Sequence, residues 1–171
     1  MKHAAHPWKD LDPHGKALSV DDFLTTKIVR LGEALRRQLT QSYVESAGLT
    51  QSQWRILSVV AEHPGMRMND LVTQAAVDKS LVSRVLRQLE VLGLVELDSV
   101  PNAPRKGLTC QLSTSGRRLY AKTIVQARRT QAEMLLRLNA TERTVLYQAI
   151  GKLAACCDVP PDCSGSASSR T

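Results

Sequence analysis

One continuous stretch constrains the fold of this chain more than any other. Residues 78–97, DKSLVSRVLRQLEVLGLVEL, place apolar side chains at helical spacing, end that pattern at Gly93 and continue with a short β-prone run. Asp78 suits the N-cap position, and Gly93 stands where a left-handed residue commonly ends a helix. The apolar stripe consists of Leu81, Val82, Val85, Leu86 and Leu89. The stretch therefore predicts a helix that packs through one face and leads directly into a strand.

Three further helices are predicted before this stretch. We expect Ser19 to cap a first helix that runs to about Tyr43, because acidic residues in its first turn would lie near the positive end of the helix dipole. Thr50 and Gln53 have the capping-box spacing at the start of a second helix, which a His-Pro-Gly sequence ends. A short third helix is predicted over about 69–76, immediately before the helix described above.

After Gly93 the sequence predicts a hairpin and two more helices. The β-prone runs LVEL and GLTCQL bracket the loop DSVPNAPRK, a pattern typical of a hairpin with a long tip. Ser113 is expected to cap a long helix that ends at about Leu138. Asn139 and Glu142 repeat the capping-box spacing before a last helix over about 140–156.

The two ends of the chain show no periodic pattern. Residues 1–18 combine proline, glycine and scattered polar residues and are expected to form a flexible arm. Residues 158–171 are rich in proline, serine and glycine and are expected to form a disordered tail. One folded domain is therefore predicted over about 19–157.

The order of the predicted elements indicates a fold class. A short helix, a turn, a second helix and a β-hairpin describe a winged helix-turn-helix, in which the second helix enters the DNA major groove. The overall class is mainly α with a small β-hairpin wing. Its second helix exposes the side chains Lys79, Ser80, Ser83, Arg84 and Arg87.

These exposed side chains are chemically suited to DNA. Ser80 and Ser83 can exchange hydrogen bonds with base edges, and Arg84 can present two donors to guanine or to phosphate. Arg87 lies a turn later, where a phosphate contact is expected. The alternative is that the same residues form an ordinary solvated helix face.

Composition is consistent with an anionic partner. The chain has 171 residues, a formal net charge of +7 and a pI near 9.5, and a basic surface attracts phosphate-bearing polymers. The N-terminus has no apolar signal region, and we find no apolar run long enough to cross a membrane. A cytoplasmic protein is therefore expected. Its four cysteines are expected to be reduced thiols.

Four segments carry a family resemblance. LTQSQWRILSVVAEHPG, DKSLVSRVLRQLEVLGLVEL, LSTSGRRLY and LNATERTVLYQAI resemble the MarR family of bacterial transcription regulators. The resemblance covers roughly residues 21–155. It implies a homodimer on a pseudo-palindromic double-stranded DNA operator, with intertwined dimerisation helices over about 19–43 and 113–156 and a DNA-binding lobe over about 49–112. Repression is the outcome that the family implies.

The resemblance also implies particular site residues. DNA contacts from the recognition helix fall on Ser80, Ser83, Arg84 and Arg87, and those from the wing fall on Arg105 and Lys106. The sequence departs from the family at three positions, because the usual wing Asp and Arg fall on Pro104 and Lys106, and the Arg common after LVE is Leu97. Small aromatic or phenolic acids often bind family members. The residues implied for that cleft are Arg36, Tyr43 and Trp54.

The alternatives to these assignments differ in what they require. Trp54 also suits a simple core position, because an amphipathic ring at an apolar position needs no ligand. The predicted dimerisation helices could instead pack on each other within one chain. A winged helix used only to bind protein would not need the basic face, and a thiol-based redox sensor would need an exposed, activated cysteine. No enzyme motif, cofactor site or metal site is predicted.

Overall fold

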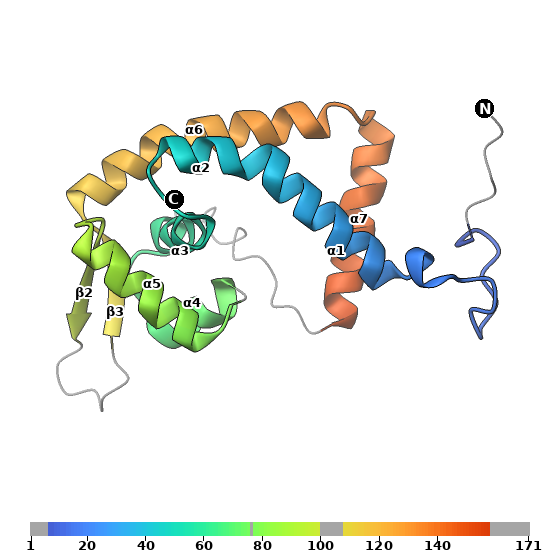
Figure 1. The fold of residues 1–171 in the computed structure, drawn as a ribbon, viewed down its shortest axis with the longest axis horizontal. Coiled ribbons are helices and arrows are strands. Elements are labelled where there is room, and N and C mark those ends of the chain that lie inside the picture. Colours follow the sequence, from blue (N-terminus) through green and yellow to red (C-terminus); the bar gives the residue numbers. More distant parts are fainter. Residues whose placement is uncertain (1–6, 76, 100–107, 158–171) are drawn as a thin grey trace, which may run out of the picture. The chain divides into compact units, whose positions relative to one another are not determined.

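The computed structural model describes residues 7–75, 77–99 and 108–157 (Figure 1). The chain divides into two compact units, Met1–Ser42 and Tyr43–Thr171.

The first unit contains hydrogen-bonded turns before its helices. Gly15 donates its backbone N–H to Asp12, and the Trp8 indole donates to the Asp22 carbonyl oxygen at 2.8 Å. The predicted arm thus includes ordered turns between residues 7 and 18. The Ser19 hydroxyl donates to the Asp22 carboxylate at 2.5 Å, but this pair closes only a single 3-10 turn, Val20–Asp22.

The prediction that Ser19 caps the long first helix is wrong. Phe23 has an extended backbone with ψ of 135°, which separates the 3-10 turn from the helix, and α1 begins one residue later (Leu24–Leu35). The helix continues through a π-helical turn (Arg36–Thr40) into α2 (Gln41–Ser46). Its end therefore lies close to the predicted position near Tyr43. A π turn holds one extra residue relative to α-helical spacing, and the apolar periodicity gave no sign of it.

The second unit contains five further helices within its described residues. They are α3 (Gln51–Glu62), α4 (Met68–Ala75), α5 (Lys79–Val91), α6 (Thr114–Leu135) and α7 (Ala140–Cys156). Three predicted caps are confirmed by the hydrogen bonds at their helix starts. Gln53 N–H donates to the Thr50 hydroxyl at 3.2 Å, Gly116 N–H donates to the Ser113 hydroxyl at 2.9 Å, and Glu142 N–H donates to the Asn139 side chain at 3.0 Å.

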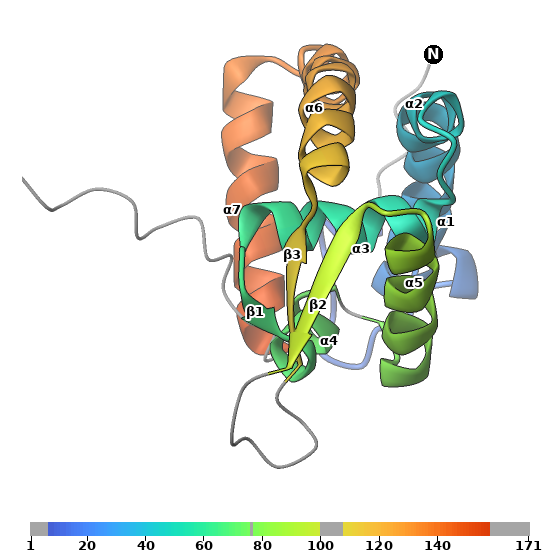
Figure 2. The same cartoon turned by 90° about the vertical axis from the view of Figure 1, so that its left-hand side faces the viewer.

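The hairpin strands belong to a three-stranded antiparallel sheet. β2 (Val95–Ser99) pairs with β3 (Leu108–Leu112), with Val95 opposite Leu112. The third strand, β1 (Met66–Arg67), pairs with the other edge of β3, which therefore lies in the middle of the sheet (Figure 2). Strand β1 was not predicted from the sequence, because two residues are too few to show an alternating pattern.

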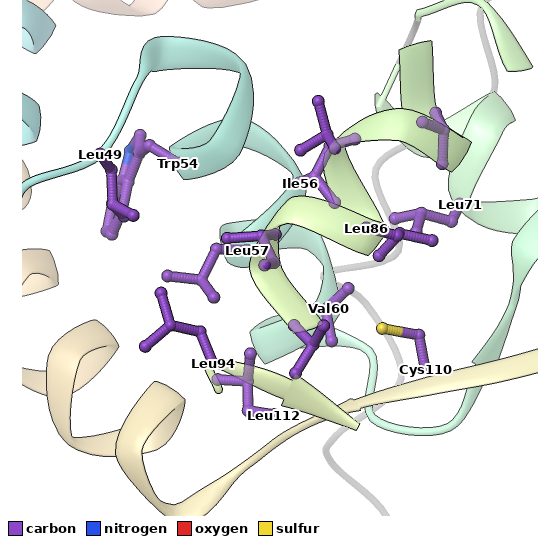
Figure 3. Close-up of a cluster of buried hydrophobic side chains, with 14 of the residues drawn as sticks. Leu49, Trp54, Ile56, Leu57, Val60, Leu71, Leu86, Leu94, Cys110 and Leu112 are labelled. Carbon is purple, nitrogen blue, oxygen red and sulfur yellow. The ribbon is translucent and has the colours of Figure 1, made fainter. Parts of the chain in front are cut away.

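One apolar core joins α3, α4, α5, α6 and the sheet of the second unit. Leu57, Val60, Leu71, Val82 and Leu89 are fully buried, and Cys110 and Leu112 reach the same cluster from β3 (Figure 3). The predicted inward stripe of α5 is confirmed at Val82, Val85, Leu86 and Leu89, while Leu81 is half-buried. Among the described residues, no helix is both long and apolar enough to span a membrane.

Candidate nucleic-acid interface

The candidate DNA-contacting helix is α5, which follows α4 after a short turn. Asp78 occupies the N-cap position with ψ of 144°, but its side chain makes no capping hydrogen bond, so any stabilisation comes from its charge near the helix N-terminus. Gly93 has φ of +66°, the left-handed conformation predicted for it. The helix is thus bounded as the sequence indicated and is held against the core along one face.

The opposite face of α5 presents the predicted site residues to solvent. Lys79, Ser80, Arg84 and Arg87 are exposed and Ser83 is half-buried. Within the described part of the chain, none of these three cations forms an ion pair. Their charges are therefore not neutralised locally, which is the arrangement that attracts a polyanion.

Arg87 has a second environment as well. A groove of about 410 Å³ lies beside the C-terminal half of α5. It is lined by Gln53, Arg87, Gln88, Val91 and Leu92. Arg87 therefore borders both the exposed basic face and an apolar hollow between α3 and α5.

The stem of the wing is acidic on its outer face. The Gln111 side-chain amide donates to the carboxylates of Glu96 and Asp98, both at 3.3 Å. Arg67 of β1 lies opposite Thr109, which in turn lies opposite Asp98, so this exposed arginine shares that face of the sheet. Arg67 is a candidate DNA contact that the sequence analysis missed, because its position depends on the unpredicted strand β1.

The predicted wing contacts belong to the loop between β2 and β3. Arg105 and Lys106 lie outside the described residues, as does Pro104. Leu97 is half-buried, pairs with Cys110 and packs against the core, so an apolar side chain suits this position.

Two of the three predicted ligand-cleft residues lie together in the second unit. Tyr43 and Trp54 are both buried, and their rings meet edge to face with centroids 5.6 Å apart. Trp54 also stacks on Tyr120, with centroids 5.8 Å apart and an interplanar angle of 22°. Arg36 belongs to the first unit, where its guanidinium pairs with Glu33. The aromatic contacts are those of a core position for Trp54, the alternative noted from the sequence.

The described cysteines differ sharply in environment. Cys110 is buried, and burial, with a smaller contribution from Glu90, raises the pKa of its thiol to about 12. Cys156 and Cys157 are exposed free thiols at the end of α7. Within the described ranges, no group of three histidine, cysteine or acidic side chains is arranged to hold a metal ion.

Comparison with known proteins connects this fold to one family. Residues 47–105, which include the helix-turn-helix and the first strand of the wing, match the model of the MarR family. The transcriptional repressor Rv2887 of Mycobacterium tuberculosis is 27% identical over 128 residues, covering 75% of this chain and 91% of the relative. The homoprotocatechuate degradative operon repressor of Escherichia coli is 26% identical over 134 residues, covering 78% of this chain and 89% of the relative.

Solved structures share the fold. The Rv2887 complex with p-aminosalicylic acid superposes with a TM-score of 0.61 at 26% identity, covering 77% of this chain and 98% of that one. NadR in complex with 4-hydroxyphenylacetate superposes with a TM-score of 0.68 at 24% identity, covering 80% of this chain and 96% of that one. The matched segment makes this chain similar to the MarR family of transcription regulators, the two relatives are named repressors, and the solved structures share its winged-helix fold.

Proposed function

We propose that this protein is a sequence-specific double-stranded DNA-binding repressor that acts as a homodimer in the bacterial cytoplasm. The observation that carries the proposal is the exposed face of α5, where Lys79, Arg84 and Arg87 have no ion-pair partner among the described residues. The core fixes the opposite face of the same helix, so these cations are presented on a rigid element. A rigid, uncompensated basic helix of this width suits the major groove.

The assigned roles follow from position along α5. Lys79, Ser80, Ser83 and Arg84 lie in its N-terminal half, the part of a recognition helix that meets base edges. Arg87 lies a turn later and is assigned to phosphate. Arg105 and Lys106 are assigned to the DNA backbone and minor groove beside the wing.

A dimer is supported by apolar side chains that remain exposed in each unit. On the first unit they are Phe23, Leu24, Ile28, Val29 and Leu31. On α7 they are Val145, Leu146, Tyr147, Ile150 and Leu153. Exposed apolar sets of this size favour burial against a second chain. Two-fold symmetry then places the half-sites about 34 Å apart.

Small aromatic acids are the proposed effectors. The ligands named in the structures of NadR and Rv2887 are 4-hydroxyphenylacetate and p-aminosalicylic acid. Each combines an aromatic ring with a carboxylate. We assign Tyr43 and Trp54, which lie together in the second unit, to the ring of such a ligand. Binding is proposed to release the DNA, and no catalytic activity is proposed for the chain.

Fluorescence anisotropy tests the proposal with the full chain. The protein is titrated against a labelled duplex from the region upstream of its own gene and against a scrambled duplex, at two salt concentrations. We expect tighter binding to the upstream duplex and a steep loss of affinity with salt. Equal weak binding to both duplexes would contradict sequence-specific recognition of this region and would favour a protein-interaction module.

A charge-reversed variant assigns the binding to α5. Arg84→Glu with Arg87→Glu should abolish specific binding while the protein stays folded and dimeric. The matched control reverses two exposed cations on α6, Arg118→Glu with Lys122→Glu, and should retain specific binding. Equal losses in both variants would show that overall charge, rather than the α5 face, determines affinity.

A further inference from the structure

The first turn of α6 is fastened to the DNA-binding lobe. The Ser113 hydroxyl donates to the Gly93 carbonyl oxygen at 2.6 Å, where α5 ends. One turn later, the Arg117 guanidinium donates to the Leu112 carbonyl oxygen at 2.6 Å. These bonds tie the start of α6 to the end of α5 and to β3, but they lie within one turn of each other and so leave the direction of the helix open to tilting.

A second attachment follows at Tyr120, on the side of α6 that faces α3. The Tyr120 phenol donates a hydrogen bond to the Glu62 carboxylate at the C-terminal end of α3. Its ring stacks on Trp54, which in turn meets Tyr43 edge to face. Burial, together with Glu62, raises the pKa of Tyr120 from its ordinary value of 10.0 to about 12, so the phenol remains a hydrogen-bond donor even at pH values where an exposed tyrosine loses its proton.

Beyond this attachment α6 packs on the core for about two more turns, through Ile124 and Ala127, and none of its described residues after Ala127 is buried. Thr123 and Ala127 are its last buried residues, and the helix continues to Leu135. The stretch from Tyr120 to Leu135 is about 22 Å long at the usual helical rise. A tilt of about 10° at Tyr120 would displace its far end by about 4 Å, comparable to the rise of one base pair of DNA. Small changes at the Tyr120 attachment are therefore large enough to alter operator spacing.

We propose that Tyr120, held by Glu62 and Trp54, is a positioning residue that sets the angle at which α6 leaves the lobe and thereby the half-site spacing that the dimer accepts. The inference rests on the proposed function, since it assumes that α6 connects the lobe to the dimer region. It states that the hydrogen bond of the Tyr120 hydroxyl determines which half-site spacing the dimer prefers, in addition to the packing that the aromatic ring contributes to the core.

The test compares Tyr120→Phe with Ser115→Ala. The first variant keeps the ring on Trp54 and loses only the hydrogen bond, and the second removes the hydroxyl of an exposed serine on α6. Glu62→Gln serves as the conservative variant, because its amide oxygen can still accept from the phenol. Each protein is titrated against the footprinted upstream site and against duplexes with one base pair inserted or removed between the half-sites.

The wild type, Ser115→Ala and Glu62→Gln should all prefer the native spacing. Tyr120→Phe should lose about threefold or more of that preference, because the constraint on α6 is weakened. Thermal unfolding should show that this variant remains folded. A spacing preference in Tyr120→Phe within about twofold of wild type would overturn the inference. An absence of specific binding by the wild type would instead overturn the proposed function, so the two failures are distinguishable.

Fluorescence gives a second readout that does not depend on DNA. In a Trp8→Phe background Trp54 is the single tryptophan of the chain. Adding Tyr120→Phe should increase acrylamide quenching of Trp54 by about twofold, because α6 moves more freely over the indole. Unchanged quenching would show that the Glu62 hydrogen bond does not restrain this helix and would contradict the inference.

Discussion

A β-carbon placed on Gly116 would lie 1.9 Å from the carbonyl oxygen of Leu94. The same carbonyl accepts a hydrogen bond from Ser113 N–H at 3.1 Å, so the backbone here cannot move away without breaking that bond. Gly116 thus allows the first turn of α6 to pack directly against the backbone of Leu94, which lies between α5 and β2. LSTSG begins one of the segments that resemble the MarR family. This close approach gives a physical reason for the glycine at its end.

Gly116→Ala is expected to destabilise the fold. The clash is with backbone rather than with a flexible side chain, so overpacking should cost about 1–3 kcal/mol or more in the free energy of unfolding. Urea unfolding measures the loss. The matched control is Gly151→Ala in α7, where an added β-carbon meets nothing within 4 Å. That substitution should stabilise the helix by about 0.5–1 kcal/mol, and equal effects of the two would show that the close approach is relieved at no cost.

Arg84→Ala should distinguish a base contact from a phosphate contact. If its guanidinium bonds guanine, the loss should be about 1–3 kcal/mol on the upstream duplex and the preference at one base pair should relax. Anisotropy with a panel of single-base variants measures both effects. Arg137→Ala, at an exposed arginine just after α6, should leave affinity and preference unchanged. A uniform loss on every duplex would assign Arg84 to phosphate.

Lys106→Ala tests the wing. A phosphate contact by this residue predicts weaker binding to all sequences and a salt dependence reduced by about one unit in the slope of log affinity against log salt. Lys152→Ala removes an exposed lysine from α7 and should not change the slope. An unchanged slope in Lys106→Ala would mean that this residue makes no backbone contact.

The described thiols should differ in reactivity at about pH 8. Cys156 and Cys157 are exposed and should be alkylated rapidly, whereas Cys110 should react only after unfolding. Its folded-state pKa of about 12 lies above the ordinary value of 9.0, so the stability that this protonated thiol contributes is present below pH 9.0 and is lost as the pH rises towards 12. Mass spectrometry of iodoacetamide-labelled peptides, with and without urea, checks the difference. Labelling of Cys110 in the folded protein would contradict its burial.

Peroxide should leave DNA affinity unchanged within about twofold. The buried thiol is held protonated, and the two exposed thiols lie at the end of α7, outside the α5 face and the wing that are assigned to DNA. Anisotropy before and after peroxide treatment measures the effect. If peroxide releases the DNA, a variant with both Cys156→Ser and Cys157→Ser will show whether these thiols are responsible, and the thiol-sensing alternative will then be favoured.

Local chemistry explains which parts of the fold the sequence could predict. Thr50 with Gln53 and Asn139 with Glu142 interact within a single turn, so their spacing alone defines the helix start. Ser19 and Asp22 have the same spacing, yet the chain becomes extended again at Phe23. A capping pair marks the beginning of a turn, and packing that lies far away in the sequence determines whether the turn continues.

Some residues of the candidate site could likewise be predicted from the sequence, and others could not. The outward positions of α5 follow from helical periodicity, so Arg84 and Arg87 could be placed on an exposed face from the sequence. Arg67 could not, because its place beside the wing depends on pairing with Thr109, a partner far along the chain. The stacking of Trp54 on Tyr120 is likewise a contact between distant helices, and neither residue's own spacing indicates it.

Strand β1 joins two parts of the lobe that winged-helix descriptions usually treat separately. It pairs with β3 through Met66 and Cys110, and the chain passes from Arg67 directly into α4 at Met68. The base of the wing and the first helix of the helix-turn-helix thus share a hydrogen-bonded joint with no intervening loop. A force that DNA exerts on the wing would be transmitted to α4 through β1. The wing and the helix-turn-helix should therefore move together as one rigid body, and the wing should not move independently of α4.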